Sequence, residues 1–203
     1  ENIDDARAIT NLSSGRMGFN IVEAAFTMGA EVTLVYGRTD IPAPEGINKI
    51  YAPNHHEMER ALLKSAGNHD IFISVAAISD YLPTRMNGKI KKDKILKLEL
   101  TKSTDILATI ASKFSHLFCV GFSAESESII KNGQLKLKNK KVDLIVSNSI
   151  NETMGEDSAE IYLVDSKEVK HITKRDKGEL AIEIMDHVYK LTTEQGYINE
   201  LNN

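Results

Sequence analysis

A run of small and polar residues at 10–18, Thr-Asn-Leu-Ser-Ser-Gly-Arg-Met-Gly, has the residue types of a loop that binds phosphate. Ser13 and Ser14 are suitable helix N-cap residues, and Gly15 and Gly18 allow a ligand or another backbone to approach closely. The free N–H groups and the positive dipole end of a helix that begins here would form an anion site. A simple helix cap is the alternative interpretation.

The residues after this loop predict a helix and then a buried strand, which together form half of a mononucleotide-binding unit. The helix is expected at 17–29 and the strand at 31–36. Four helix residues have the spacing of one buried face: Val22, Ala25, Phe26 and Gly29. The loop differs from the dinucleotide fingerprint Gly-x-Gly-x-x-Gly, because the first glycine is missing.

A second candidate site follows a continuous apolar run at 70–77, which is typical of a strand covered on both faces. Ligands of open α/β sheets bind beyond the carboxyl ends of the strands. Ala76 and Ala77 are small enough to let a ligand lie against the backbone, and Asp80 offers a carboxylate to a sugar, a base or a metal ion. The alternative is that Asp80 only caps a local turn.

Lysines gather in two further places. The segment 89–97 holds five of them and is expected to begin in a mobile loop, since it follows Asn87-Gly88. Lys136 and Lys140 lie four residues apart on an expected helix. In both places the lysines could neutralise a polyphosphate, although charged runs of this kind are more often solvated surface.

The cluster Lys102-Ser-Thr-Asp105 stands at the expected start of a helix over 105–113. Either Ser103 or Thr104 is expected to cap this helix, and the N–H groups at the same place could hold a ligand. The sequence offers no competing Ser-His-Asp, Cys-His or paired-carboxylate arrangement.

Strand and helix patterns alternate along most of the chain. Besides those above, strands are expected at 47–51, 96–101, 117–122 and 142–147, and helices at 56–66 and 125–139. This alternation predicts an α/β fold with a Rossmann-like, doubly wound and mostly parallel sheet. A β-hairpin at about 159–172 and a C-terminal amphipathic helix at 176–193 are expected to be appended, and the polar tail 194–203 to be frayed.

The composition of the 203 residues argues against several classes of function. A net charge of −4 gives no electrostatic support for nucleic-acid binding, and no apolar run reaches the length of a membrane span. A single cysteine, Cys119, is expected to be a buried strand residue, and its isolation fits a reducing cytoplasm. The six histidines show no metal-ligand spacing and are expected on the surface or in packing contacts.

Six of these segments resemble, in chain order, the motifs of phosphopantothenoylcysteine synthetases. They are residues 10–18, 76–81, 89–92, 102–105, 120–125 and 136–148. The resemblance runs from residue 1 to about 172 and implies one synthetase domain over 1–193.

The resemblance implies a ligase reaction of coenzyme A biosynthesis. In that family a nucleoside triphosphate, CTP in the bacterial branch, activates the carboxylate of 4′-phosphopantothenate as an acyl-cytidylate and releases pyrophosphate. The amine of L-cysteine then forms the amide and releases CMP. The family requires Mg²⁺, forms homodimers and is often fused to a flavin-containing phosphopantothenoylcysteine decarboxylase. No flavin is expected in this chain.

The resemblance also implies roles for individual residues. Asn11 matches the asparagine that binds the acyl intermediate, and Lys89 matches the flap lysine that covers the phosphates. The phosphate loop would comprise Asn11, Ser13, Ser14, Gly15, Met17 and Gly18. The nucleotide pocket would comprise Ser74, Val75, Ala76, Ala77, Asp80, Lys89, Lys102, Ser103, Thr104, Asp105, Phe122, Lys136 and Lys140. The metal ligand is unassigned, with Asp80 as the one candidate.

Two departures from the family pattern accompany the resemblance. The strand and Gly-Gly-Thr-type turn that the family has before Glu1 are missing, which predicts a domain separated from a longer protein, and Thr104 stands where the family often has proline. Two other functions stay open. One is an NAD(P)-dependent oxidoreductase, in which Arg38 could suit a 2′-phosphate. The other is a non-catalytic nucleotide-binding relative, against which the retention of Asn11 and Lys89 argues.

Overall fold

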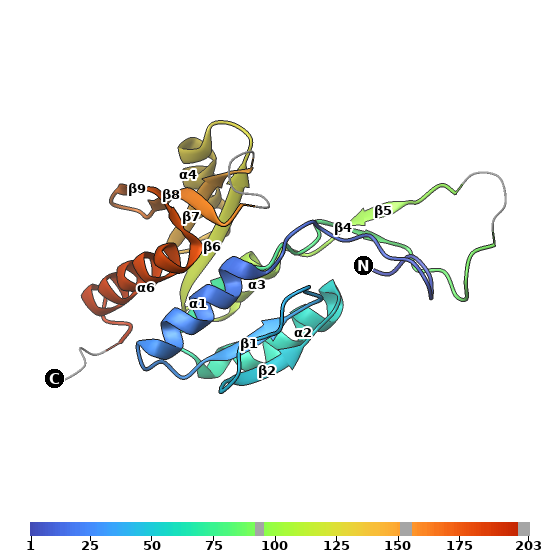
Figure 1. Cartoon of the computed structure of the whole chain (residues 1–203), viewed down its shortest axis with the longest axis horizontal. Coiled ribbons are helices and arrows are strands. Elements are labelled where there is room, and N and C mark those ends of the chain that lie inside the picture. The colour runs from blue at the N-terminus through green and yellow to red at the C-terminus, as the bar shows by residue number, and fades with distance from the viewer. Residues whose placement is uncertain (92–95, 151–155, 199–203) are drawn as a thin grey trace.

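The computed structural model describes residues 1–91, 96–150 and 156–198 (Figure 1). Its helices are α1 (Arg16–Thr27), α2 (His55–Ser65), the 3₁₀ turn η1 (Ala66–Asn68), α3 (Ile106–Lys113), α4 (Ile129–Lys140) and α6 (Lys177–Glu194). Its strands are β1 (Thr33–Tyr36), β2 (Asn48–Tyr51), β3 (Ile71–Ser74), β4 (Tyr81–Pro83), β5 (Leu100–Lys102), β6 (Phe118–Glu125), β7 (Leu144–Ser149), β8 (Ser158–Val164) and β9 (Val169–Asp176). This is the expected α/β fold. None of the helices within the described ranges is both long and apolar enough to cross a membrane.

The main sheet has five strands in the order β3-β6-β7-β8-β9. β3, β6 and β7 run parallel, whereas β8 and β9 form the expected hairpin and add to β7 in the antiparallel sense. β1 and β2 pair in parallel as a separate two-stranded unit. The hairpin therefore extends the central sheet, and the carboxyl ends of β3, β6 and β7 meet at one edge.

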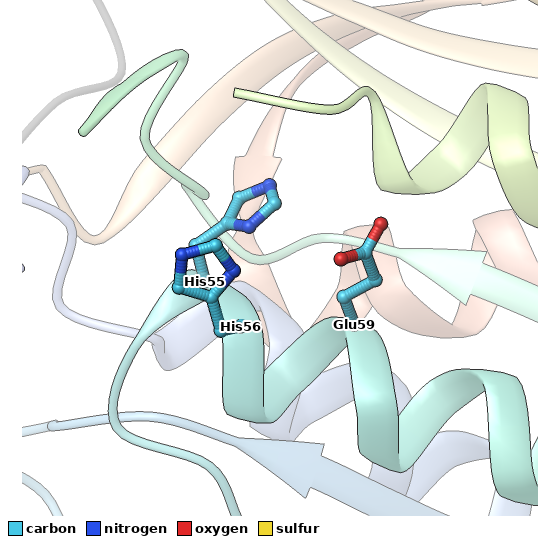
Figure 2. Close-up of side chains that lie close together, drawn as sticks. All are labelled: His55, His56 and Glu59. Atoms are coloured by element: carbon cyan, nitrogen blue, oxygen red, sulfur yellow. The ribbon is translucent and has the colours of Figure 1, made fainter. Parts of the chain in front are cut away.

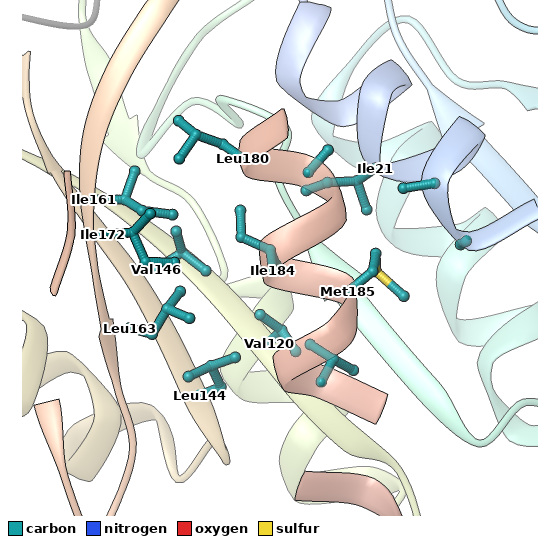
Figure 3. Close-up of a cluster of buried hydrophobic side chains, with 14 of the residues drawn as sticks. Ile21, Val120, Leu144, Val146, Ile161, Leu163, Ile172, Leu180, Ile184 and Met185 are labelled. Carbon is teal, nitrogen blue, oxygen red and sulfur yellow. The ribbon is translucent and has the colours of Figure 1, made fainter. Parts of the chain in front are cut away.

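The core of the molecule lies on both faces of this sheet. α6 covers one face and packs against α1 on its other side, so that Ile184 and Val188 are fully buried among residues such as Val146 (Figure 3). α3 and α4 cover the opposite face, where Ile110 contributes to a second apolar cluster. Because β6 and β7 are covered on both sides, their sequences are continuous apolar runs. Full burial of one such aliphatic side chain stabilises the fold by roughly 1.5–3 kcal/mol.

Cys119 is buried in β6, as expected. Burial, together with the nearby Asp143 charge, raises the pKa of the Cys119 thiol to about 12. The Asp143 carboxylate accepts a hydrogen bond from the Cys119 backbone N–H at 2.7 Å. A thiol with such a high pKa stays protonated at neutral pH, so Cys119 is a packing residue and not a nucleophile.

An extended arm projects from the body of the molecule (Figure 1). It consists of β4 and β5, which pair in the antiparallel sense, and the N-terminal residues that run beside them. The backbone N–H of Met86 donates to the Ile3 carbonyl at 2.8 Å, and that of Ile90 donates to the Asp4 carboxylate at 3.0 Å. The Arg7 guanidinium also bonds to Asp4 and holds the pKa of that carboxyl well below its usual range. The arm thus joins two segments about 80 residues apart in sequence.

Several local predictions were wrong. Neither Ser13 nor Ser14 caps α1; the N-cap is Gly15, and Ser14 Oγ accepts only a long 3.4 Å bond from the Arg16 N–H. Phe26 is 52% exposed, so the buried face of α1 lies around Ile21 and Ala25 instead.

The strand expected at 96–101 is shorter in the structure, where β5 spans Leu100–Lys102. Its partner strand β4 was not predicted. The helix expected to begin at residue 125 begins at Ile129, because β6 continues as far as Glu125. The tail is not frayed at Tyr197, whose ring packs edge-on against Phe118; residues 199–203 lie outside the described part.

Candidate functional site

A cavity of about 770 Å³ opens at the carboxyl ends of the parallel strands. It is lined by the loop 10–15, the start of α1, the loops that follow β1 and β3, the start of α3 and one face of α4. Of the residues that the sequence assigned to the phosphate loop and the nucleotide pocket, all line this cavity except Lys89 and Lys102. The topology of the sheet thus brings several separate predicted segments of the chain, the first at Asn11 and the last at Lys140, to the same cavity.

The start of α1 has the geometry of an anion site. Gly15 adopts a left-handed conformation with φ +78°, and a Cβ added there would lie 2.9 Å from Thr39 Cγ2, so glycine is required on two grounds. Gly18 lies against Val75 at the end of β3. The first-turn N–H groups of Met17 and Gly18 have no carbonyl partner within the helix, as at any helix start, and they belong to residues that line the cavity.

Asn11 lies beside the loop that follows β3. Its side-chain amide Nδ2 donates a hydrogen bond to the Ala77 carbonyl at 2.7 Å. This bond fixes the orientation of the amide, since Nδ2 must be the donor. The carbonyl oxygen of the amide, and the second N–H of Nδ2, remain available to a ligand in the cavity.

The loop that carries Asp80 is tied to the start of α3. The backbone N–H of Ser103 donates to the Asp80 carbonyl at 2.9 Å, and Ser103 Oγ donates to the Ser79 carbonyl at 2.8 Å. Ser103 therefore joins two loops, whereas Asp105 is the N-cap of α3 and accepts from the Ala108 N–H at 3.0 Å. The prediction of Ser103 or Thr104 as the cap was wrong by one or two residues.

Two lysines of α4 point at this cavity and each is paired with a carboxylate. Lys136 Nζ lies 2.7 Å from Glu125 Oε1, and Lys140 Nζ lies 2.6 Å from Asp105 Oδ2. Burial alone would raise the pKa of Glu125, but the hydrogen bonds from Lys136, Ser123 and other donors outweigh it, so the pKa is lowered. Burial would also raise the pKa of Asp105, but the hydrogen bonds from Lys140 and the Ala108 N–H, together with the Lys140 charge, lower it overall. Both carboxylates are charged at neutral pH, so a bound phosphate must share these lysines with them.

The sequence missed one cationic residue of the cavity altogether. Lys177, the first residue of α6, lines the cavity and is only 8% exposed. Burial lowers its pKa, and the charge of Arg16 lowers it further. No local signal could have found Lys177, because the β8–β9 hairpin returns the chain to this edge of the sheet. Arg38, considered above only for a 2′-phosphate, also lines the cavity.

The structure does not bring Lys89 or Lys102 to the cavity. Both are exposed and both belong to the projecting arm, Lys102 in β5 and Lys89 in the segment beyond β4 (Figure 1). Lys92 and Lys94 of the predicted lysine-rich segment lie outside the described residues.

Comparison with known proteins shows the family and the fold of the chain. Residues 1–191 match the family model described as the DNA/pantothenate metabolism flavoprotein C-terminal domain, and the chain belongs to this family. It is 37% identical over 199 residues to the coenzyme A biosynthesis bifunctional protein CoaBC of Vibrio vulnificus (strain CMCP6), a match that covers 94% of this chain and 50% of the relative.

Two solved structures have the same fold. The crystal structure of the C-terminal domain of a coenzyme A biosynthesis bifunctional protein CoaBC superposes with a TM-score of 0.83, at 29% identity over 96% of this chain and 91% of the other. A Cab2 mutant H337A in complex with phosphopantothenate-cysteine has a TM-score of 0.72, at 15% identity over 96% of this chain and 85% of the other, which supports the fold alone. The chain spans about half the length of the curated relatives that it matches.

Proposed function

We propose that this domain joins 4′-phosphopantothenate to L-cysteine in coenzyme A biosynthesis, with a nucleoside triphosphate as the activating substrate. The observation that carries the proposal is the convergence of the predicted motif residues on one cavity at the carboxyl edge of the sheet. The curated relatives are bifunctional proteins of the same pathway, which supports this choice over the oxidoreductase and over a non-catalytic relative.

The reaction must make a carboxylate electrophilic while two anionic reactants meet. In the proposed first step the carboxylate oxygen of 4′-phosphopantothenate attacks the α-phosphorus of CTP, which forms an acyl-cytidylate and releases pyrophosphate. In the second step the cysteine amine attacks the acyl carbon and CMP leaves. Positioned cations and N–H donors lower both barriers, because they hold the reactants together and stabilise the developing charge.

The loop at the start of α1 is suited to bind a phosphate or the acyl-phosphate. Its donors are backbone N–H groups and the Ser13 and Ser14 hydroxyls, which add no negative charge. Asn11 is suited to orient the acyl intermediate for the same reason, since its amide can donate a hydrogen bond while it stays neutral. The Ala77 carbonyl holds that amide in place.

The opposite side of the cavity is suited to the nucleotide. Lys136 and Lys140 can each turn from a carboxylate partner to a phosphate oxygen, and the small residues Ala76 and Ala77 leave space beside the backbone for a base or ribose. The preference for CTP over ATP is part of the proposal and comes from the resemblance to the bacterial branch of the synthetase family.

Mg²⁺ fits this cavity as a partner of the triphosphate. Asp105 is occupied by Lys140 and by the cap of α3, which leaves Asp80 as the loop carboxylate suited to hold the ion. A single carboxylate with phosphate and water ligands is a usual arrangement for Mg²⁺. When bound, the ion neutralises part of the triphosphate charge.

We further propose that the domain works as a homodimer in the cytoplasm, alongside a phosphopantothenoylcysteine decarboxylase. The curated relatives are bifunctional proteins twice the length of the matched region, which supports a decarboxylase partner. The exposed arm supports a contact with a second copy, because Lys89 belongs to this arm and does not line the cavity of its own chain. A lysine on such an arm is suited to close over phosphates bound in the cavity of a second copy.

The test is a turnover assay by mass spectrometry with CTP, Mg²⁺, 4′-phosphopantothenate and L-cysteine, in which each component is left out in turn. We expect phosphopantothenoylcysteine and CMP only when all three organic substrates are present. Binding of CTP without product would instead favour a non-catalytic nucleotide-binding relative. Binding of NADPH in preference to CTP would favour the oxidoreductase.

A further inference from the structure

A cluster of metal-binding side chains lies at the start of α2, outside the residues assigned to the proposed reaction. His55, His56 and Glu59 place one ligand atom each so that all three atoms lie within 4.8 Å of one another. Figure 2 shows the three side chains on one side of the first turns of the helix. The sequence predicted the histidines to be surface or packing residues. In the structure the adjacent His55 and His56 lie beside Glu59, which follows His56 by three residues.

The helix start positions these side chains for a structural reason. The Asn54 side chain caps α2 by accepting a hydrogen bond from the Glu57 N–H at 3.0 Å. His55 and His56 are the first two helical residues, and Glu59 lies three residues after His56 on the same face. Helix geometry thus places the side chains of His56 and Glu59 on one face. The His55 side chain lies beside them at the first position of the helix.

His55 supplies the observation that points to a ligand. The ring is 2% exposed, and its Nε2 lies 2.9 Å from the Thr104 carbonyl oxygen. Because a carbonyl oxygen can only accept, Nε2 carries the proton, and the neutral ring then presents a bare lone pair at Nδ1. That buried Nδ1 has no hydrogen-bond partner among the described residues. A buried imidazole nitrogen without a partner is costly in an apolar setting and is the usual donor to a metal.

The contacts around the cluster resemble the outer shell of a metal site. The hydrogen bond from Nε2 to Thr104 fixes the tautomer and the orientation of the His55 ring, which is the role such bonds have beside metal-ligating histidines. Thr104 Oγ1 also donates to Glu59 Oε1 at 2.7 Å. A carboxylate has lone pairs to accept this bond and still ligate a cation.

From this arrangement we propose that His55 Nδ1, His56 and Glu59 bind one Zn²⁺ ion. Two imidazoles and one carboxylate are a donor set that suits Zn²⁺, whereas Mg²⁺ favours oxygen donors alone. Zinc bonds of about 2.0–2.2 Å in a tetrahedron require ligand atoms about 3.4 Å apart. The cluster must therefore tighten on binding zinc, which rotation of the exposed His56 and half-buried Glu59 side chains can provide.

The fourth tetrahedral position is open to water or to a ligand. The site joins α2 to the loop at Thr104, which also lines the candidate nucleotide cavity, as does His55. Bound Zn²⁺ would hold that loop in place. The proposal does not depend on the reaction proposed above, because it rests only on side chains of α2 and their contacts with Thr104.

Metal-free protein titrated with Co²⁺ and then with Zn²⁺ tests the proposal. We expect one Co²⁺ per chain with the visible absorption of a four-coordinate complex, and its loss when Zn²⁺ displaces the ion. Excess Mg²⁺ should leave the spectrum unchanged. His56→Ala and Glu59→Gln should each weaken Zn²⁺ binding by about 100-fold, because each removes a ligand.

His116→Ala is the matched control, since it removes an exposed histidine elsewhere in the chain and should bind Zn²⁺ as the unaltered protein does. The decisive variants avoid His55, whose burial makes its removal a test of stability as well. The proposal would be overturned if no saturable binding of one ion per chain occurred, or if His56→Ala and Glu59→Gln bound Zn²⁺ as tightly as His116→Ala.

Discussion

At the scale of single residues, the important property of Asn11 is that it combines hydrogen-bonding capacity with zero charge. The hydrogen bond from Nδ2 to the Ala77 carbonyl fixes the position of the side chain beside the phosphate loop. A carboxylate in this position would face the phosphate of the acyl intermediate and would also lose its donor to Ala77. Because asparagine and aspartate have nearly identical shapes, the substitution changes the charge and this hydrogen bond but not the size of the side chain.

We predict that Asn11→Asp slows product formation by about 100-fold or more, as removal of a polar group that stabilises an intermediate usually does. The measurement is steady-state turnover, together with quenched-flow detection of the acyl-nucleotide. Because Asn11 is exposed, the melting temperature should stay within a few degrees of the original. Unchanged turnover in this variant would remove Asn11 from the mechanism.

Lys136 and Lys138 form a matched pair on α4. Lys136 lines the cavity and pairs with Glu125, whereas Lys138 is exposed on the same helix. We predict that Lys136→Gln raises the KM for CTP by about tenfold, because a charge-assisted hydrogen bond contributes about 1.5–3 kcal/mol. Lys138→Gln should leave that KM unchanged. Equal effects of the two substitutions would mean that only the net charge of the helix matters.

At the scale of elements, a glycine in α4 allows this helix to pack closely against the sheet. A Cβ added at Gly133 would lie 2.4 Å from Ser147 Oγ in β7, so the helix can approach the strand only with glycine at this position. This close approach places Lys136 and Lys140 at the cavity. Ser147 Oγ is itself buried and has no hydrogen-bond partner among the described residues, so that its removal costs little.

We predict that Gly133→Ala lowers the free energy of unfolding by about 1–3 kcal/mol, the usual cost of overpacking, although alanine is the better helix former. Adding Ser147→Ala should restore most of the loss, because it removes the atom that clashes. Chemical denaturation of the two single variants and the double variant measures the coupling. If the two effects simply add, the close contact is not what requires glycine.

Local signals predicted most elements but not every boundary. The buried strands β6 and β7 and the apolar face of α6 were predicted well, because continuous apolar runs and a 3.6-residue period depend on burial alone. The cap of α3 was misplaced because serine, threonine and aspartate are all good caps, and Lys140 on another helix favours Asp105 through an ion pair. Phe26 was misplaced because the orientation of α1 depends on α6, which lies 150 residues later in the chain.

At the scale of the whole molecule, the candidate site depends on contacts that no local pattern contains. The order of the strands unites loops from distant segments, and the hairpin brings Lys177 to the same cavity. Motifs matched in chain order could therefore suggest many of the residues that line the cavity, but not Lys177. The arm formed by β4, β5 and the N-terminal residues was likewise not predicted, since its pairing joins short and largely polar segments.

The position of Lys89 on this arm leads to a prediction about function and stability. We expect Lys89→Gln to reduce turnover by about 100-fold while the melting temperature stays nearly constant, because an exposed side chain contributes little to the fold. The matched control is Lys113→Gln, which removes an exposed lysine at the end of α3. A large drop in melting temperature for Lys89→Gln would mean that Lys89 has a structural role.

The proposed reaction requires that the carboxylate of 4′-phosphopantothenate becomes bonded to the α-phosphorus of CTP. Turnover of 4′-phosphopantothenate labelled with ¹⁸O in its carboxylate tests this directly, since each mechanism transfers the label to a different product. We predict that one ¹⁸O atom appears in CMP and that pyrophosphate is unlabelled. Label in inorganic phosphate, or product formed with unlabelled CMP, would contradict the acyl-cytidylate and with it the proposed reaction.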